Sequence, residues 1–208
     1  MKITVVTGNV GKIASFRRCL EPLGFDVAHE NIDLIEPQLD SIEEVALSKA
    51  RQAHAALKRP LIVEDTGFYV EALNDFPGPY NKYVIGKVGV KGYLALMDGE
   101  TNRNCRFFSA LVYIDAGGKE HVFTSETKGT LALEPDKTPL RSDAKSTLWQ
   151  LYIPDGFDKT LNELNGAERQ AFRKLSEDTS VAAIFAKWLA AQEQPQPLNK
   201  LPVKKPRP

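Results

Sequence analysis

The stretch that decides the fold is residues 61–70, LIVEDTGFYV. Its first three residues are apolar strand formers, and they run directly into two adjacent acids, Glu64 and Asp65. Such a run predicts a buried strand that ends at the acids. A carboxylate is costly to bury without a partner, so the pair marks either a solvated turn or a binding site.

The residues before this stretch alternate between strand and helix patterns. Residues 2–6 (KITVV) predict a buried strand, and a turn and a helix follow, the helix ending at Gly24. Residues 25–33 predict an extended segment, and residues 41–58 predict a helix that starts with a capping box. This order of elements predicts an α/β fold with a largely parallel sheet on its N-terminal side.

The residues after the stretch predict a second lobe. Residues 106–115 and 119–133 flank a Gly-Gly pair and predict an antiparallel hairpin that extends or curls the sheet. Residues 161–192 carry a helical apolar pattern. We therefore expect one two-lobed domain over residues 1–192, with a mixed sheet flanked by helices. Residues 193–208 are proline-rich and basic, and they predict a disordered tail or, alternatively, a docking or targeting arm.

The bulk composition excludes several classes of protein. With 208 residues, 42% of them hydrophobic, the chain can bury one sizeable core. A formal net charge of zero provides no global field that would attract nucleic acid or an acidic membrane. Cys19 and Cys105 are too few for a disulfide framework, and no apolar run approaches a membrane span. We expect a soluble, cytoplasmic protein.

The turn TGNVGK, residues 7–12, predicts an anion-binding site. A Walker A motif has four residues between its first glycine and its Gly-Lys pair, whereas only two follow Gly8 here, so this is not a P-loop. A strand, a glycine turn and a helix N-terminus still leave backbone N–H groups free to face an anion. Thr7 and Asn9 add side-chain donors, and Lys12 adds a positive charge. An ordinary tight turn is the alternative.

Lys49 lies on the apolar stripe of its predicted helix, three residues after Ala46 and four before Ala53. A lysine in such a place either extends its ammonium group to solvent or meets a negative partner. The sequence leaves both interpretations open. A phosphate or a carboxylate at the strand ends is the partner that the second interpretation requires.

The ends of two neighbouring strands bring these features together. Ligands of open α/β sheets bind outside the carboxyl ends of the strands. The turn at residues 7–12 and the acids Glu64 and Asp65 would meet there. Oxygen ligands beside phosphate donors suit a magnesium–nucleotide complex, and one carboxylate could deprotonate an attacking water.

Residues 76–83, FPGPYNKY, contain a further candidate for phosphate binding. The Pro-Gly-Pro segment predicts a rigid turn, after which Tyr80, Lys82 and Tyr83 present two rings and a cation. Lys82 could neutralise part of a triphosphate's charge, and packing is the alternative role for this segment.

The motifs TGNVGK, EDTGF and FPGPYNKY, in this order, resemble the inosine triphosphate pyrophosphatase family. The resemblance extends from residue 1 to about residue 170 and includes IDLIEPQLDSIEEVALSKA and IPDGFDKTLNEL. It implies magnesium-dependent hydrolysis of non-standard purine nucleoside triphosphates to a monophosphate and pyrophosphate. It also implies a homodimer of two-lobed subunits with the active site in the cleft between the lobes.

The resemblance assigns roles to particular residues. Glu36 and Asp65 are the implied magnesium ligands, Asp65 is also the implied base for water, and Lys49 is implied beside it in catalysis. The implied triphosphate contacts are Thr7, Gly8, Asn9, Lys12, Lys49, Thr66 and Lys82.

The base-binding region departs from the family pattern. Within STLWQLY, Trp149 keeps the aromatic platform, but Gln150 stands where the family has an aspartate. Arg169 replaces a family lysine, and the family's Ser-His-Arg cluster becomes Arg173, Lys174 and Leu175. We expect a base pocket formed by Trp149, Gln150, Arg169, Arg173 and Lys174. The alternatives to a purine triphosphate pyrophosphatase are a nucleotide-binding regulatory or accessory protein without turnover and a pyrophosphatase for a different, modified nucleotide.

Overall fold

A seven-stranded mixed sheet organises the computed structural model, which describes residues 2–144 and 146–193. The strands pair in the order β2-β1-β3-β5-β6-β7, and β4 pairs with the far end of β3. The strands are β1 (Lys2–Val6), β2 (Asp26–Glu30), β3 (Leu61–Val70), β4 (Pro77–Gly78), β5 (Asn104–Ile114), β6 (Glu120–Leu131) and β7 (Tyr152–Pro154).

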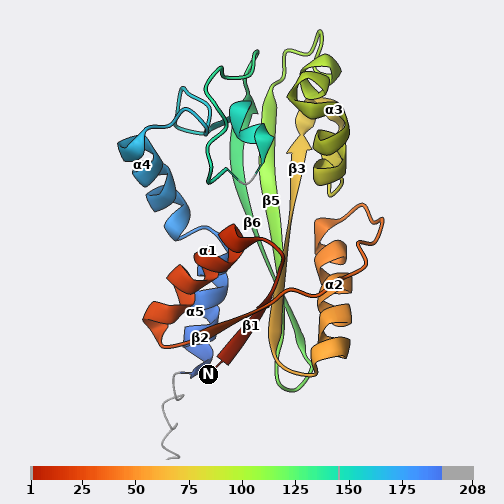
Figure 1. Cartoon of the computed structure of the whole chain (residues 1–208), viewed down its shortest axis with the longest axis vertical. Coiled ribbons are helices and arrows are strands. Elements are labelled where there is room, and N and C mark those ends of the chain that lie inside the picture. The colour runs from red at the N-terminus through yellow and green to blue at the C-terminus, as the bar shows by residue number, and fades with distance from the viewer. Residues whose placement is uncertain (1, 145, 194–208) are drawn as a thin grey trace, which may run out of the picture.

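Helices cover both faces of this sheet (Figure 1). Strands β3, β5 and β6 run through the length of the molecule, α2 and α3 lie one above the other beside them, and α1 packs with α5 in the lower lobe. The helices are α1 (Val10–Leu20), α2 (Ile42–Leu57), α3 (Asn81–Leu96), α4 (Gly166–Glu177) and α5 (Val181–Glu193), with short 3-10 turns η1 (Glu21–Leu23), η2 (Glu71–Leu73) and η3 (Thr147–Gln150).

The expected end of β3 is wrong, because the strand continues through both acids to Val70. Its parallel pairing with β1 involves only residues 61–63, opposite Thr4–Val6. The remaining residues of β3 stay in the sheet because they pair antiparallel with β5 over its whole length. Glu64 and Asp65 therefore lie in the middle of a strand, just beyond the end of β1.

The other elements predicted before and after this strand are present. The predicted hairpin is β5–β6, and both of its strands join the same sheet. Helix α2 begins where expected, since the Ser41 hydroxyl accepts a hydrogen bond from the Glu44 N–H at 3.3 Å. The same hydroxyl donates to the carboxylate of Glu43 at 2.8 Å.

Helix α3 is an element without a sequence prediction, and it is broken. Gly89 has φ 63° and ψ −174°, a conformation that only glycine adopts at low cost, and it divides the helix into two segments. The second segment places Tyr93 in the core of the upper lobe, fully buried against Phe68.

Helix α5 ends at Glu193, and the rest of the predicted tail, residues 194–208, lies outside the described residues. Among the helices that the structure describes, none is long and apolar enough to cross a membrane.

Candidate active site

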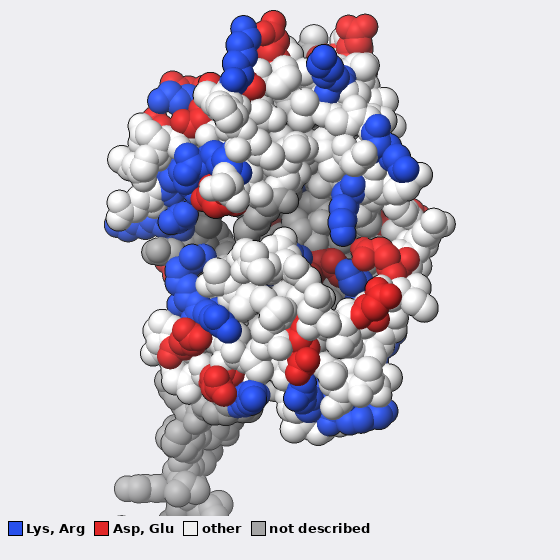
Figure 2. All heavy atoms as spheres, viewed as in Figure 1, with Lys and Arg blue, Asp and Glu red and all other residues white. Residues whose placement is uncertain are grey.

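A cleft with a volume of about 950 Å³ lies between the lobes, and most of the predicted site residues line it. Figure 2 shows the surface hollowed between the upper and lower lobes, with acidic and basic side chains near the hollow. One part of the lining is polar: Thr7, Gly8, Asn9, Lys12, Glu36, Lys49, Glu64, Asp65, Thr66 and Lys82. Another part is apolar and mostly aromatic: Phe107, Trp149, Tyr152, Leu161 and Phe172.

The β1–α1 turn is stabilised by its own side chains. Asn9 caps α1 by accepting a hydrogen bond from the Gly11 N–H at 2.9 Å, and the Asn9 N–H donates to the Thr7 hydroxyl oxygen at 3.1 Å. The hydroxyl hydrogen of Thr7 and the side-chain NH₂ group of Asn9 can still donate to a ligand. The turn thus has the donors that binding of an anion requires.

The two adjacent acids of β3 serve opposite faces of the sheet, because successive side chains of a strand alternate. On one face, the ammonium group of Lys12 donates to the backbone carbonyl of Glu64 at 2.6 Å and lies 3.8 Å from its carboxylate. Thr66, on the same face, donates to the Glu64 carboxylate at 3.3 Å. Asp65 points to the other face, toward α2.

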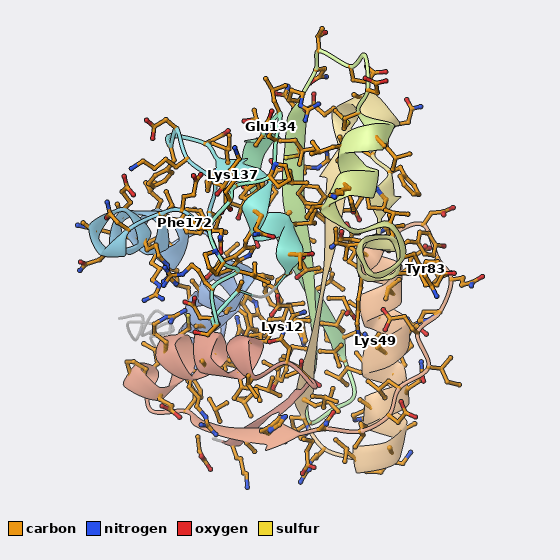
Figure 3. The ribbon with its side chains drawn as sticks, turned by 45° about the horizontal axis from the view of Figure 1, so that its top comes forward. Lys12, Lys49, Tyr83, Glu134, Lys137 and Phe172 are labelled. Atoms are coloured by element: carbon orange, nitrogen blue, oxygen red, sulfur yellow. The ribbon has the colours of Figure 1, made fainter. Side chains whose placement is uncertain are left out.

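Lys49 meets negative partners rather than extending into solvent. Its ammonium group is 2.9 Å from Asp65 Oδ1 and 3.0 Å from Glu36 Oε2, and its side chain is only 15% exposed. Figure 3 shows Lys12 and Lys49 on α1 and α2, both near the centre of the molecule. The lysine on the apolar stripe of α2 is therefore part of a charge cluster.

Burial and charge compete in setting the pKa values of this cluster. Burial raises the pKa of Asp65 above its ordinary value, and the nearby Lys12 and Lys49 offset only part of that rise. Burial alone would lower the pKa of Lys49, but Asp65 and Glu36 raise it by more, so it stays above its ordinary value. Lys49 is therefore charged at neutral pH, and Asp65 accepts a proton more readily than an exposed aspartate.

The carboxylates of Asp65 and Glu36 fit a magnesium ion. Asp65 Oδ2 is buried and has no hydrogen-bond partner among the described residues, so one oxygen of this carboxylate can still accept a ligand. Glu36 is 66% exposed and shares Lys49 with Asp65. Within residues 2–144 and 146–193, no cluster of three or more His, Cys, Asp or Glu residues could hold a metal. Two carboxylates completed by phosphate oxygens and water are nevertheless an ordinary magnesium environment.

The aromatic end of the cleft contains only one of the residues predicted to bind the base. Trp149, on η3, lines the cleft opposite elements from both lobes. The Gln150 amide instead donates to the Thr138 carbonyl at 3.1 Å. Among the described residues, the lining does not include Gln150, Arg169, Arg173 or Lys174.

The arginines of α4 gather around an acid that sequence reasoning missed. Arg169 is hydrogen-bonded to the carboxylate of Asp143, Arg141 donates to it at 3.1 Å, and Arg173 lies 4.0 Å from it. Asp143 belongs to the loop that leads into η3 and places a carboxylate near the base end of the cleft. The segment that contains it has no periodic pattern, so the sequence carried no signal for this placement.

A second hollow of about 800 Å³ is lined by Tyr69, Arg106, Phe108 and their neighbours. It contains none of the residues predicted to bind substrate or metal. We assign the candidate active site to the cleft between the lobes, because the paired charges and the Asp65 carboxylate with its unpartnered oxygen are there.

Comparisons with known proteins show which family the chain resembles. The model of the Ham1 family matches residues 3–177. The chain is 39% identical over 188 residues to the dITP/XTP pyrophosphatase of Methanopyrus kandleri, with 90% of this chain and 96% of that protein covered. It is 35% identical over 189 residues to the dITP/XTP pyrophosphatase of Thermococcus kodakarensis, covering 91% and 97%.

A solved structure shows the same fold. The nucleoside-triphosphatase / dITP/XTP pyrophosphatase from Mycobacterium abscessus superposes with a TM-score of 0.68 at 25% identity, covering 94% of this chain and all of that one. The predicted α/β fold, a mixed sheet flanked by helices, is confirmed.

Proposed function

The chain belongs to the Ham1 family, and from this premise we propose that it is a magnesium-dependent pyrophosphatase of non-standard purine nucleoside triphosphates. The products would be the nucleoside monophosphate and pyrophosphate. Two relatives named dITP/XTP pyrophosphatases align with most of the chain, which supports this substrate class. The observation that carries the proposal is the cluster of Lys12, Lys49 and Asp65 in a cleft with an aromatic end.

The cleft accommodates a nucleotide in one orientation. A triphosphate requires cations and N–H donors, which the polar end offers through the turn at residues 7–12 and through Lys12, Lys49 and Lys82. A purine requires an apolar face, and Trp149 offers one at the other end. The reacting α-phosphate would then lie between these ends, near Asp65.

Asp65 would accept the proton of the attacking water. The water oxygen forms a bond to the α-phosphorus, the bond from that phosphorus to its bridging oxygen breaks, and pyrophosphate leaves with the negative charge. Lys49 holds Oδ1 of Asp65 in place, and the lysines of the polar end stabilise the charge of the leaving group. Magnesium held by Glu36 and Asp65 would neutralise further phosphate charge.

A screen of nucleoside triphosphates tests the proposal. The purified protein is incubated with dITP, XTP, dGTP and dATP, with and without magnesium, and pyrophosphate and monophosphate are measured. We expect dITP and XTP each to release pyrophosphate and the nucleoside monophosphate in equal amounts. This release should require magnesium. Tight nucleotide binding without product would favour the accessory-protein alternative, and release of orthophosphate would contradict the proposed bond cleavage.

The resemblance also supports a cytoplasmic homodimer as part of the proposal. Sedimentation of the purified chain would test the assembly, since a dimer has twice the monomer mass of 23.1 kDa. A single species at the monomer mass across micromolar concentrations would contradict it.

A further inference from the structure

Asn81 is a polar residue of the cleft lining that the proposed reaction has not used. It is the first residue of α3 and precedes Lys82, which lines the cleft as well. Ile85, one turn further along, packs in the same apolar cluster as Trp149. Asn81 therefore lies where the phosphate-binding part of the cleft approaches the aromatic part.

A buried tyrosine fixes the orientation of the Asn81 side chain. The Tyr93 hydroxyl donates to Asn81 Oδ1 at 2.6 Å. Tyr93 is fully buried and packs edge-on against Phe68, with 6.1 Å between the ring centroids. Burial also raises the pKa of Tyr93, so its phenol keeps the proton that it donates. Because the amide oxygen is already bound, the NH₂ group is the part of the Asn81 side chain that can donate to a ligand.

The break in α3 makes this contact possible. Asn81 and Tyr93 are 12 residues apart, which in a straight helix would separate their backbones by about 18 Å. Two side chains cannot span that separation along one helix. The glycine conformation at Gly89 turns the second segment of α3 back, so that the Tyr93 hydroxyl reaches the first residue of the first segment.

We propose that Asn81 is a further substrate-binding residue, whose amide is oriented by Tyr93 across the break in α3 and donates a hydrogen bond to an oxygen of the nucleotide. The inference rests on the proposed function, because it takes the ligand of the cleft to be a nucleoside triphosphate. The atom that accepts the hydrogen bond from Asn81 is either the sugar 2′-hydroxyl or an oxygen that ribo- and deoxyribonucleotides share. Tyr93 is a positioning residue, since it acts through Asn81.

Kinetics of the Asn81→Ala variant with ITP and dITP test the contact. We expect kcat/KM to fall by roughly 5- to 50-fold, as the loss of one hydrogen bond to a polar or charged ligand predicts. A loss confined to ITP identifies the 2′-hydroxyl as the acceptor, and an equal loss for both substrates identifies a shared oxygen. A kcat/KM within about twofold of the parent for both substrates would overturn the inference.

A double-mutant cycle with Tyr93→Phe tests the positioning role. This variant keeps the buried ring and removes only the hydroxyl. We expect it to lower kcat/KM for the same substrates as Asn81→Ala does, and to have no further effect in the Asn81→Ala background. An equal effect in both backgrounds would show that the hydroxyl acts on the fold and not through Asn81. Tyr69→Phe is the matched control, because Tyr69 lines the second hollow and not the cleft.

Calorimetric binding of ITP and dITP in the absence of magnesium separates this inference from the proposed function. Turnover by the parent protein tests the proposed function alone. If the parent binds these nucleotides without turnover, at least fivefold weaker binding of ITP, alone or together with dITP, by Asn81→Ala still supports the inference, and equal affinity for both nucleotides overturns it. A parent protein that neither binds nor hydrolyses ITP or dITP would overturn both.

Discussion

At Asp65, burial and charge act in opposite directions on one carboxylate. Burial disfavours its ionised form, whereas Lys49 and Lys12 favour that form, and the balance leaves its pKa raised. One of its oxygens is bound by Lys49, and the other is buried without a hydrogen-bond partner among the described residues. A carboxylate held in this way can accept a proton and can bind a cation, and these are the two roles that we propose for it.

Replacing Asp65 by asparagine removes the charge at almost constant volume. We expect Asp65→Asn to lower the rate of pyrophosphate release by about 100-fold or more, because general-base catalysis alone contributes roughly 10²- to 10⁴-fold. The circular dichroism spectrum should not change. Asp178→Asn is the control, since Asp178 is 80% exposed and pairs with Lys187. Activity of Asp65→Asn within a few-fold of the parent would contradict the assignment.

Lys49→Met tests the ion pair itself. From the sequence alone, methionine suits the apolar stripe of α2 and would preserve or raise stability. The structure reverses this expectation, because the substitution leaves the mostly buried Asp65 carboxylate without the cation that it pairs with. We expect the free energy of unfolding at pH 7 to fall by about 1–3 kcal/mol, less than for a fully buried pair because Lys12 remains nearby.

The pH dependence of this effect has a definite sign. Without Lys49, the folded-state pKa of Asp65 rises further above its unfolded value of about 3.9. A raised pKa of an acid costs stability once the pH exceeds the unfolded value, and the cost disappears below it. Urea denaturation should therefore show the largest difference from the parent at neutral pH and a smaller one near pH 4. Lys49→Met/Asp65→Asn should recover most of the loss, and a single variant as stable as the parent at pH 7 would contradict the ion pair.

At the scale of elements, the sequence predicts well where local signals decide the structure. Helix α2 has a cap, a stripe of apolar residues and a clear end, and it is present as expected. The length of β3 is decided instead by its partner β5, which begins more than thirty residues later in the chain. Lys12 and Lys49 approach from opposite faces, and they make two acids tolerable in the middle of the strand.

The cap of α2 gives a prediction at this scale. Ser41→Ala removes the acceptor for the Glu44 N–H, so the free energy of unfolding should fall by about 1 kcal/mol. Activity at 25 °C should not change, because Ser41 does not line the cleft. Thr101→Ala, at an exposed loop position, is the control for losing a hydroxyl. Urea midpoints that agree for Ser41→Ala and the parent would contradict the capping role.

For the whole molecule, the predictability of the site differs between the two ends of the cleft. The phosphate end is formed by contiguous motifs, and the structure brings Thr7, Asn9, Lys12 and Lys82 to the same cleft as predicted. The base end is formed by segments distant in the chain, among them β5, η3, β7 and α4, whose meeting depends on long-range packing. The family resemblance implies that Gln150 lies there, whereas in the folded chain its amide donates to the Thr138 carbonyl.

The last prediction concerns the base end of the cleft. Two variants there separate the binding of any purine base from the discrimination between purine bases. Trp149→Ala removes a stacking surface, and stacking tolerates every purine, so kcat/KM should fall by roughly 5- to 100-fold for dITP, XTP, dGTP and dATP alike. Arg169 carries directional N–H donors, is bound to Asp143 and is not among the described residues that line the cleft. If Arg169 recognises the base, as the family resemblance implies, Arg169→Met should change the ratio of kcat/KM for XTP to kcat/KM for dATP by about 3- to 10-fold. Trp149→Ala should leave this ratio within about twofold of the parent's. Arg18→Met, on the exposed side of α1, is the matched control. An unchanged ratio in Arg169→Met would assign Arg169 to holding α4 against the Asp143 loop, and selection of the base would then belong to the residues that line the cleft.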